Sequence, residues 1–142
     1  MESTWPMWLN PALTGVSAHL LYFVVALAAI VLFVAIYTAI TPYWEIRLIR
    51  QGNTAAAISL GGAILGYTCP LAQAVAQSGS LADMLLWSGV ALVAQLLAYG
   101  ATRLVLPQLS AHVNEGKIAP ATFLAALSVA IGILNAAAMS DG

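Results

Sequence analysis

Four long apolar stretches divide this chain of 142 residues, and they restrict its fold more than any other feature of the sequence. The stretches cover residues 17–40, 54–77, 82–106 and 119–139. At about 1.5 Å of rise per residue, each is long enough to cross a hydrocarbon core of about 30 Å as a helix. Because lipid cannot hydrogen-bond to the backbone, a spanning segment must pair its own N–H and C=O groups, as a helix does. The sequence therefore predicts an all-α integral membrane protein with four transmembrane helices.

The composition excludes several classes of function. Apolar residues make up 62% of the chain and charged residues only 6%, a balance too apolar for a soluble domain of this length. The net charge is −1 and no block of Lys or Arg occurs, so nucleic acid is not an expected partner. The single cysteine, Cys69, cannot form an intrachain disulfide or a thiolate metal cage. We expect the lipid bilayer as the main partner, with no cofactor and no metal.

The basic residues indicate how the chain is threaded. They lie in, or within one helical turn of, the connections at residues 41–53 and 107–118: Arg47, Arg50, Arg103 and Lys117. Cytoplasmic loops carry the excess of Lys and Arg, so both connections are predicted to face the cytoplasm. The opposite side receives Glu2, Asp83 and Asp141 without a base. Both termini are therefore predicted to lie outside.

The two halves of the chain resemble each other. One constant offset pairs Leu20-Leu21-Tyr22 with Leu85-Leu86-Trp87, Val25-Ala26-Leu27 with Val90-Ala91-Leu92, and Pro42 with Pro107. This pattern favours two tandem parallel hairpin repeats, residues 17–77 and 78–142, related by an axis along the membrane normal. Chance similarity among Leu, Ala and Val is the alternative. Residues 1–16, with Trp5 and Trp8, are predicted to form a tail at the membrane interface, where indole rings collect.

Small and polar residues share one face of the second segment and one face of the fourth. At a period of about 3.6 residues, the first stripe contains Ser59, Gly62, Gly66, Pro70, Gln73 and Gln77, and the second contains Ala121, Ala125, Ser128, Gly132 and Asn135. In lipid, small residues let helix backbones approach, and polar residues hydrogen-bond across the contact. We predict that these two segments make the central contact, closest at Gly62 and Gly66. The stripes also favour self-association into a homo-oligomer.

A polar ridge runs along the third segment, where Gln95, Tyr99 and Arg103 recur every four residues. One interpretation is a polar pathway or binding groove. The other is structural: Gln95 bonds to a neighbouring helix, Tyr99 packs, and Arg103 extends to the headgroups. For Arg103, the position about one turn from the helix end favours the structural interpretation.

Pro70 marks a second point of interest, in the second segment. It has no N–H for the carbonyl of Gly66, which predicts a kinked helix with a free acceptor at depth. Tyr67, Thr68 and Gln73 are near enough in the sequence to surround that carbonyl, which predicts a place for a small cation or a water. The alternative is that Thr68 or a neighbouring helix satisfies the carbonyl.

Certain residues and motifs are absent from the sequence. No Asp or Glu lies deep in an apolar segment, which disfavours proton-coupled antiport, because such carriers depend on an embedded carboxylate. No phosphate-binding loop, zinc-protease motif or nucleophile elbow occurs. We therefore expect no catalytic residues and no enzymatic activity.

Several short motifs follow one another in a specific order: Ile40-Thr41-Pro42, Asn53-Thr54-Ala55-Ala56, Leu65-Gly66-Tyr67, Pro70-Leu71, Ala91-Leu92-Val93 and Gln95-Leu96-Leu97. With this combination the chain resembles the YjfL-like inner-membrane proteins, a domain-of-unknown-function family. The resemblance implies a multi-pass bacterial inner (plasma) membrane protein built from a duplicated two-helix unit, so that the termini predicted outside are periplasmic. It implies little about activity, because the family has no established catalytic residues to carry over to this chain. Relatives are often encoded near phage-shock-like stress proteins and ATP-grasp ligases, an association with envelope stress.

Two functions are compatible with these features. The first is a self-associating accessory or interaction module in envelope maintenance or stress, with envelope-stress proteins as partners by family association. The alternative is a small channel or carrier for a small solute or cation, with a path lined by Gln73, Gln95, Tyr99 and Asn135. Interhelical hydrogen bonding is the other role open to Asn135.

Overall fold

The computed structural model describes residues 6–140, and every element in that range is helical. Four helices are long: α1 (Leu9–Ile40), α3 (Thr54–Gln77), α4 (Leu81–Val105) and α6 (Ile118–Met139). Two are short: α2 (Glu45–Arg50) and α5 (Leu109–Asn114). Each long helix has the length and hydropathy to cross a membrane, which confirms the prediction of an all-α protein with four such helices. Glu2, Trp5 and Asp141, to which some predictions refer, lie outside the described residues.

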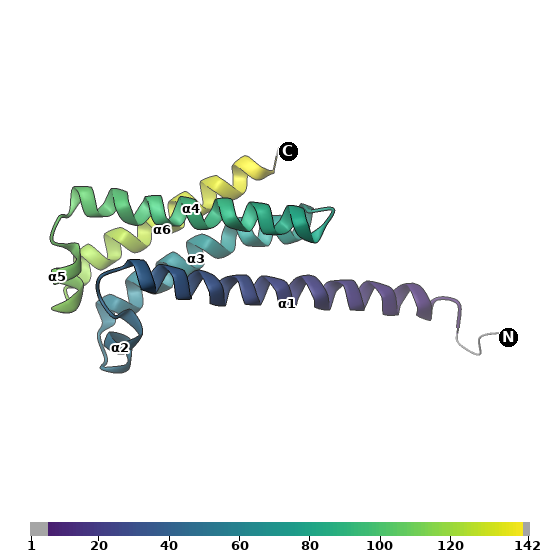
Figure 1. The fold of residues 1–142 in the computed structure, drawn as a ribbon, viewed down its shortest axis with the longest axis horizontal. Helices are drawn as coiled ribbons and strands as arrows, with labels where there is room; N and C mark the ends of the chain where they lie inside the picture. Colours follow the sequence, from purple (N-terminus) through teal and green to yellow (C-terminus); the bar gives the residue numbers. More distant parts are fainter. Residues whose placement is uncertain (1–5, 141–142) are drawn as a thin grey trace.

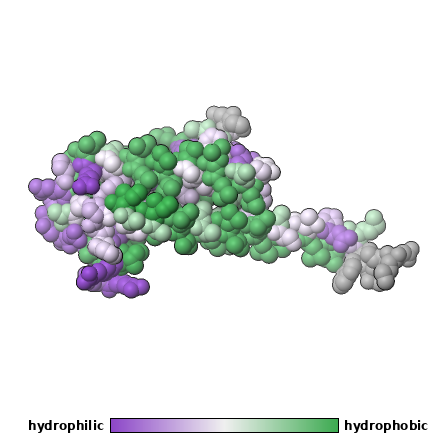
Figure 2. Space-filling view, in the orientation of Figure 1, coloured by the Kyte–Doolittle hydropathy of each residue, from purple (hydrophilic) through white to green (hydrophobic). Residues whose placement is uncertain are grey.

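The long helices run along one direction, and the short helices gather at one end (Figure 1). α3, α4 and α6 form a bundle, while α1 packs beside α3 and α4 and extends past them. The turn between α3 and α4, the start of α1 and the end of α6 lie away from α2 and α5. In Figure 2 apolar side chains form a broad belt along the molecule, and hydrophilic side chains gather at the end with α2 and α5. This separation is expected of a chain that spans a bilayer.

The first helix begins earlier than predicted. We expected the first segment to start near Ser17, but α1 begins at Leu9, so part of the expected tail is helical. Pro11 does not prevent this, because it lies in the first turn, where backbone N–H groups have no helical acceptor. The 32 residues of α1 span about 48 Å, well beyond a hydrocarbon core of about 30 Å. α1 is thus long enough to begin in the headgroup region, with the exposed indole of Trp8 at its start.

The two connections between hairpin helices share one local design. As predicted, α1 and α4 end before Pro42 and Pro107, but the short helices that follow were not predicted. Each short helix ends before a glycine with positive φ, 86° at Gly52 and 79° at Gly116. Glycine is favoured there because it lacks the Cβ that makes this conformation costly. Both connections are therefore compact caps rather than open loops.

Asn53 holds the two connections together. Its Oδ1 accepts a hydrogen bond from the Ala56 N–H at 3.0 Å, which caps α3. Its Nδ2 donates to the Val113 carbonyl at the end of α5, at 2.8 Å. The polar end of the bundle is consequently a single packed unit.

The most extensive helix contact is between α3 and α6, the two segments predicted to make the central contact. Their backbones are so close that a Cβ added at Gly62 would overlap Ala125, and one added at Gly132 would overlap the Gly66 carbonyl. Glycine is required at these points, because any side chain would hold the two helices apart.

Candidate functional site

Gln95 lies at the junction of three helices. Its side chain is 1% exposed, and its Nε2 donates to the Ser128 carbonyl of α6 at 3.0 Å. The same nitrogen lies against Gly66 of α3, 2.7 Å from the position that a Cβ would take there. Its Oε1 has no hydrogen-bond partner among residues 6–140. Gln95 therefore links α4 to both α3 and α6.

The other polar candidates have different surroundings. Tyr99 is buried, and its ring meets that of Tyr37 edge-on with 5.9 Å between centroids. Arg103 is exposed in the last turn of α4. Asn135 of α6 is half-buried, and its Nδ2 finds no hydrogen-bond partner in the described part of the chain. The three polar residues of α4 therefore have different environments: Gln95 is hydrogen-bonded to another helix, the ring of Tyr99 is buried, and Arg103 is exposed.

The residues around Pro70 are not gathered about a common point. α3 continues through Pro70, and the Gly66 carbonyl lies against Gly132, whose Cα–H groups can approach an oxygen closely. The neighbouring side chains make other contacts. Tyr67 stacks on Phe33 with 4.3 Å between ring centroids. Thr68 Oγ1 donates to the Ile64 carbonyl at 2.7 Å, and Gln73 Nε2 donates to Ser140 Oγ at 3.1 Å. The structure therefore does not bring Tyr67 and Gln73 together at the Gly66 carbonyl.

A buried polar cluster, which the sequence analysis did not identify, lies where α1 turns into α2. Burial alternates along this connection: Thr41, Tyr43 and Glu45 are buried, whereas Pro42 and Trp44 are exposed. Alternation by two residues is the property of extended backbone, and Thr41 has extended dihedral angles. Glu45 is consequently 0% exposed, although it lies outside the apolar segments.

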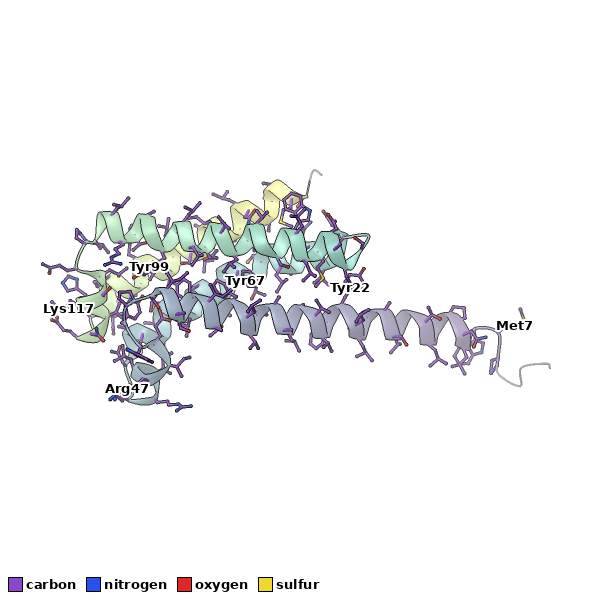
Figure 3. All side chains as sticks on the ribbon, viewed as in Figure 1. Met7, Tyr22, Arg47, Tyr67, Tyr99 and Lys117 are labelled. Carbon is purple, nitrogen blue, oxygen red and sulfur yellow. The ribbon has the colours of Figure 1, made fainter. Side chains whose placement is uncertain are left out.

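Tyrosine hydroxyls from several parts of the fold accompany this carboxyl group. Tyr43 comes from the same connection, Tyr37 from α1 and Tyr99 from α4, and each interacts electrostatically with Glu45. Within residues 6–140, neither the three hydroxyls nor the two carboxyl oxygens have a hydrogen-bond partner. Figure 3 shows Tyr99 between α1 and α4, toward the end of the molecule that carries Arg47 and Lys117. The cluster is therefore a polar site at the boundary between the apolar belt and the polar end.

Burial controls the protonation of this site. It raises the pKa of the Glu45 carboxyl from 4.5 to about 8, and the adjacent Thr41 and Tyr43 offset part of the shift. Burial also raises the pKa of the Tyr43 phenol above its usual value. No ion pair to Glu45 occurs in the described range, where Lys117 pairs with Glu115 at 3.3 Å. At neutral pH the Glu45 carboxyl is therefore mostly protonated.

Sequence reasoning missed Glu45 because it looked for buried carboxyl groups only within the apolar segments, and Glu45 lies in a connection between two of them. The sequence carried no signal for this burial, because the exposed residues Pro42 and Trp44 are more apolar than the buried Thr41 and Glu45. The statement that no Asp or Glu lies deep in an apolar segment did not imply that no carboxyl group is buried. No group of three or more His, Cys, Asp and Glu in residues 6–140 is placed to hold a metal ion.

The fold and its polar residues define a polytopic helical membrane protein in which polar side chains join helices and one carboxyl group is buried at the polar end. Residues 11–139 match the family described as Domain of Unknown Function (DUF350), and the chain belongs to this family. This confirms the resemblance seen in the sequence.

Two curated relatives show how far the similarity extends. The chain is 40% identical over 119 residues to the UPF0719 inner membrane protein YjfL of Escherichia coli (strain K12), covering 84% of this chain and 90% of that protein. It is 33% identical over 78 residues to the UPF0719 transmembrane protein YshE of Bacillus subtilis (strain 168), covering 55% of this chain and 58% of that protein. No solved structure matches the chain significantly.

Proposed function

We propose that this protein is a self-associating accessory module of the bacterial inner membrane, in which the α3–α6 face of one copy packs against that of a second copy. The observation that carries the proposal is an open groove of about 670 Å³ along the outer side of the α3–α6 contact. No charged residue lines it, and small or apolar residues do: Ala57, Ile58, Gly61, Gly62 and Leu65 of α3, and Thr122, Ala125, Ala126, Val129, Ala130 and Ile133 of α6.

Small residues allow a second helix to approach this groove closely. Within lipid, association depends on van der Waals packing and hydrogen bonds, because lipid tails are as apolar as the helices. At Gly61 the backbone is bare, and a Cβ added there would meet no atom within 4 Å. Leu65 and Ile133 are exposed beside the small residues, and their side chains would insert into the same groove of the second copy. A twofold pair would therefore bury the same surface on both copies.

The orientation we infer places α2 and α5 in the cytoplasm and both termini in the periplasm. Support comes from the exposed bases Arg47, Arg50, Arg103 and Lys117 near the ends of the helices that face α2 and α5. The Escherichia coli relative carries an inner-membrane location in its name. Reporter fusions that place either terminus in the cytoplasm would contradict this orientation.

The two hairpins, residues 17–77 and 78–142, are inferred to be copies of one unit, preceded by residues 1–16. Both connections contain a short helix and a glycine with positive φ, which supports this inference. Gly66 and Gly132, which align when the offset between the two halves is shifted by one residue, also lie against each other. Equivalent residues meet where a pseudo-twofold axis passes, so their contact favours an axis between α3 and α6. A role in envelope maintenance or stress, with stress proteins as partners, has only the family association as support.

Replacing Gly61 by leucine is expected to abolish self-association, because the larger side chain fills the groove that a second copy would enter. The measurement is the mass of the purified protein in nanodiscs and in mild detergent, which should fall from that of a dimer to that of one chain. Gly100→Leu on α4 is the matched control, because a Cβ at Gly100 also meets no atom within 4 Å. Wild-type protein that is monomeric in both environments would rule the proposal out.

A small channel or carrier is the second candidate, favoured by buried polar atoms in the bundle that lack partners among the described residues, including Gln95 Oε1 and Ser128 Oγ. Replacing Gln95 by leucine separates the two functions. In a conduit, the flux of potassium, protons or spermidine into liposomes should fall to that of empty liposomes. In an association module, wild-type protein shows no flux, and the substitution lowers stability by about 1 kcal/mol, the usual scale of one interhelical hydrogen bond.

A further inference from the structure

The buried Glu45 carboxyl requires either a proton or a positive charge beside it. An ionised carboxylate without a partner is strongly unfavourable in a protein interior. The basic residues nearest in sequence do not supply the partner: Arg47 lies two positions along α2, and residues two apart do not face each other on a helix. Arg103, on α4, interacts with Tyr99. The titratable groups that interact with Glu45 are the tyrosines at positions 37, 43 and 99, all neutral at physiological pH.

The side chains near Glu45 present oxygen lone pairs. Thr41 Oγ1 donates to the Tyr37 carbonyl at 3.1 Å, and Ser59 Oγ donates to the Ala56 carbonyl at 3.0 Å. Because both hydroxyl protons are engaged, the lone pairs of these oxygens remain available. Thr41 lies beside Glu45, and Ser59 lies beside Tyr43. Carboxylate and hydroxyl oxygens are the ligands that hard cations prefer.

A groove gives this cluster a route to the polar end of the molecule. It has a volume of about 490 Å³ and lies between the last turn of α1 and the start of α2. Thr38, Thr41, Tyr43 and Glu45 are among its lining residues, and so is the exposed Arg47. The carboxyl oxygens lie beneath the surface of this groove, so an ion that enters along it reaches them only when side chains of the connection move. One carboxyl group, with an arginine near it, limits the bound charge to a single positive one.

We propose that Glu45, together with Thr41 and the tyrosine hydroxyls, binds one alkali cation, Na⁺ or K⁺, in exchange for a proton. In this exchange the carboxylic acid releases its proton to water and the resulting carboxylate binds the cation, so the charge of the site does not change. None of these residues lines the α3–α6 groove, so the site does not depend on the proposed self-association.

The exchange can be measured as proton release. Purified protein in nanodiscs is held at pH 8 in a weakly buffered solution of N-methylglucamine chloride with a pH indicator. NaCl or KCl then replaces the N-methylglucamine chloride at constant ionic strength. Because the pKa of the Glu45 carboxyl is about 8, saturating cation should release about half a proton per chain. The response should be absent when fresh N-methylglucamine chloride is added instead.

Two variants and a control assign the release to this site. Glu45→Gln, which reproduces the neutral acid, should release nothing, whereas Glu115→Gln, at an exposed carboxyl on the same end, should behave as wild type. Tyr43→Phe removes one oxygen and keeps the ring, and should raise the cation concentration needed for half of the release severalfold. Wild-type protein that releases no more proton with Na⁺ or K⁺ than with N-methylglucamine would overturn the proposal. Equal release from wild type and Glu45→Gln would overturn it as well.

Discussion

Replacing Gly132 by alanine is expected to disrupt the contact between α3 and α6, while replacing Gly61 by alanine leaves the fold intact. A Cβ at residue 132 would overlap the backbone carbonyl of Gly66, so no side-chain rotation can relieve the clash. Overpacking of this kind costs about 1–3 kcal/mol and more when backbone must move. The measurement is the thermal unfolding of purified protein in mild detergent, in which Gly132→Ala should melt well below wild type.

Two adjacent glycines of α3 provide the matched comparison. A Cβ at Gly62 would overlap Ala125, whereas one at Gly61 meets no atom within 4 Å. Gly62→Ala should therefore destabilise the protein. Gly61→Ala should be neutral or stabilising by about 0.5–1 kcal/mol, because alanine restricts the unfolded chain. If both variants melt at the same temperature, the close α3–α6 contact is wrong.

The stability of the wild-type protein is expected to fall as the pH rises from about 4.5 to about 8, the unfolded and folded pKa values of the Glu45 carboxyl. Within that window the folded state retains a proton that the unfolded state has lost, so each rise in pH favours unfolding. The contribution of the Glu45 carboxyl to the free energy of unfolding is complete below pH 4.5 and is lost above pH 8. Its size is on the order of 5 kcal/mol, from a shift between 4.5 and about 8 at about 1.4 kcal/mol per pKa unit.

Glu45→Gln should remove most of this pH dependence, because the amide stays neutral and keeps nearly the same shape. The measurement is the melting temperature between pH 4.5 and pH 9 in N-methylglucamine buffers, which supply no alkali cation. Glu115→Gln, at an exposed residue, should retain the wild-type slope. Parallel curves for wild type and Glu45→Gln would show that the carboxyl group is not buried.

Much of the fold could be predicted because it depends on local composition. Runs of more than 20 apolar residues can satisfy their backbone in lipid only as helices, so the four long helices are readable from hydropathy. Pro42 and Pro107 mark helix ends because proline disfavours helical backbone before it. The short helices α2 and α5 were missed because six residues carry too little periodic signal. The start of α1 was misplaced because residues 1–16 were interpreted as an interfacial tail from Trp5 and Trp8, whereas the helix begins at Leu9.

The candidate residues depended on contacts between distant parts of the chain. The stripe of small residues was enough to predict that α3 meets α6 closely at Gly62 and Gly66, but the sequence could not show the open groove beside Gly61 on the outer side of that contact. Gln95 was recognised as polar at depth, whereas its link to Ser128 required the positions of three helices. Hydropathy places a residue relative to the bilayer, and it does not say which neighbours surround that residue.

The sequence by itself determined that this protein is a four-helix membrane protein, because a long apolar segment in lipid can satisfy its backbone N–H and C=O groups only as a helix. It also determined the family, through motifs that follow one another along most of the chain. Only the tertiary structure decided that Glu45 is buried, because the groups that interact with it include Tyr37 of α1 and Tyr99 of α4, which the fold brings to a connection that is polar in sequence. The protonation of a carboxyl group is set by the atoms packed around it, and those atoms come from segments far apart in the chain.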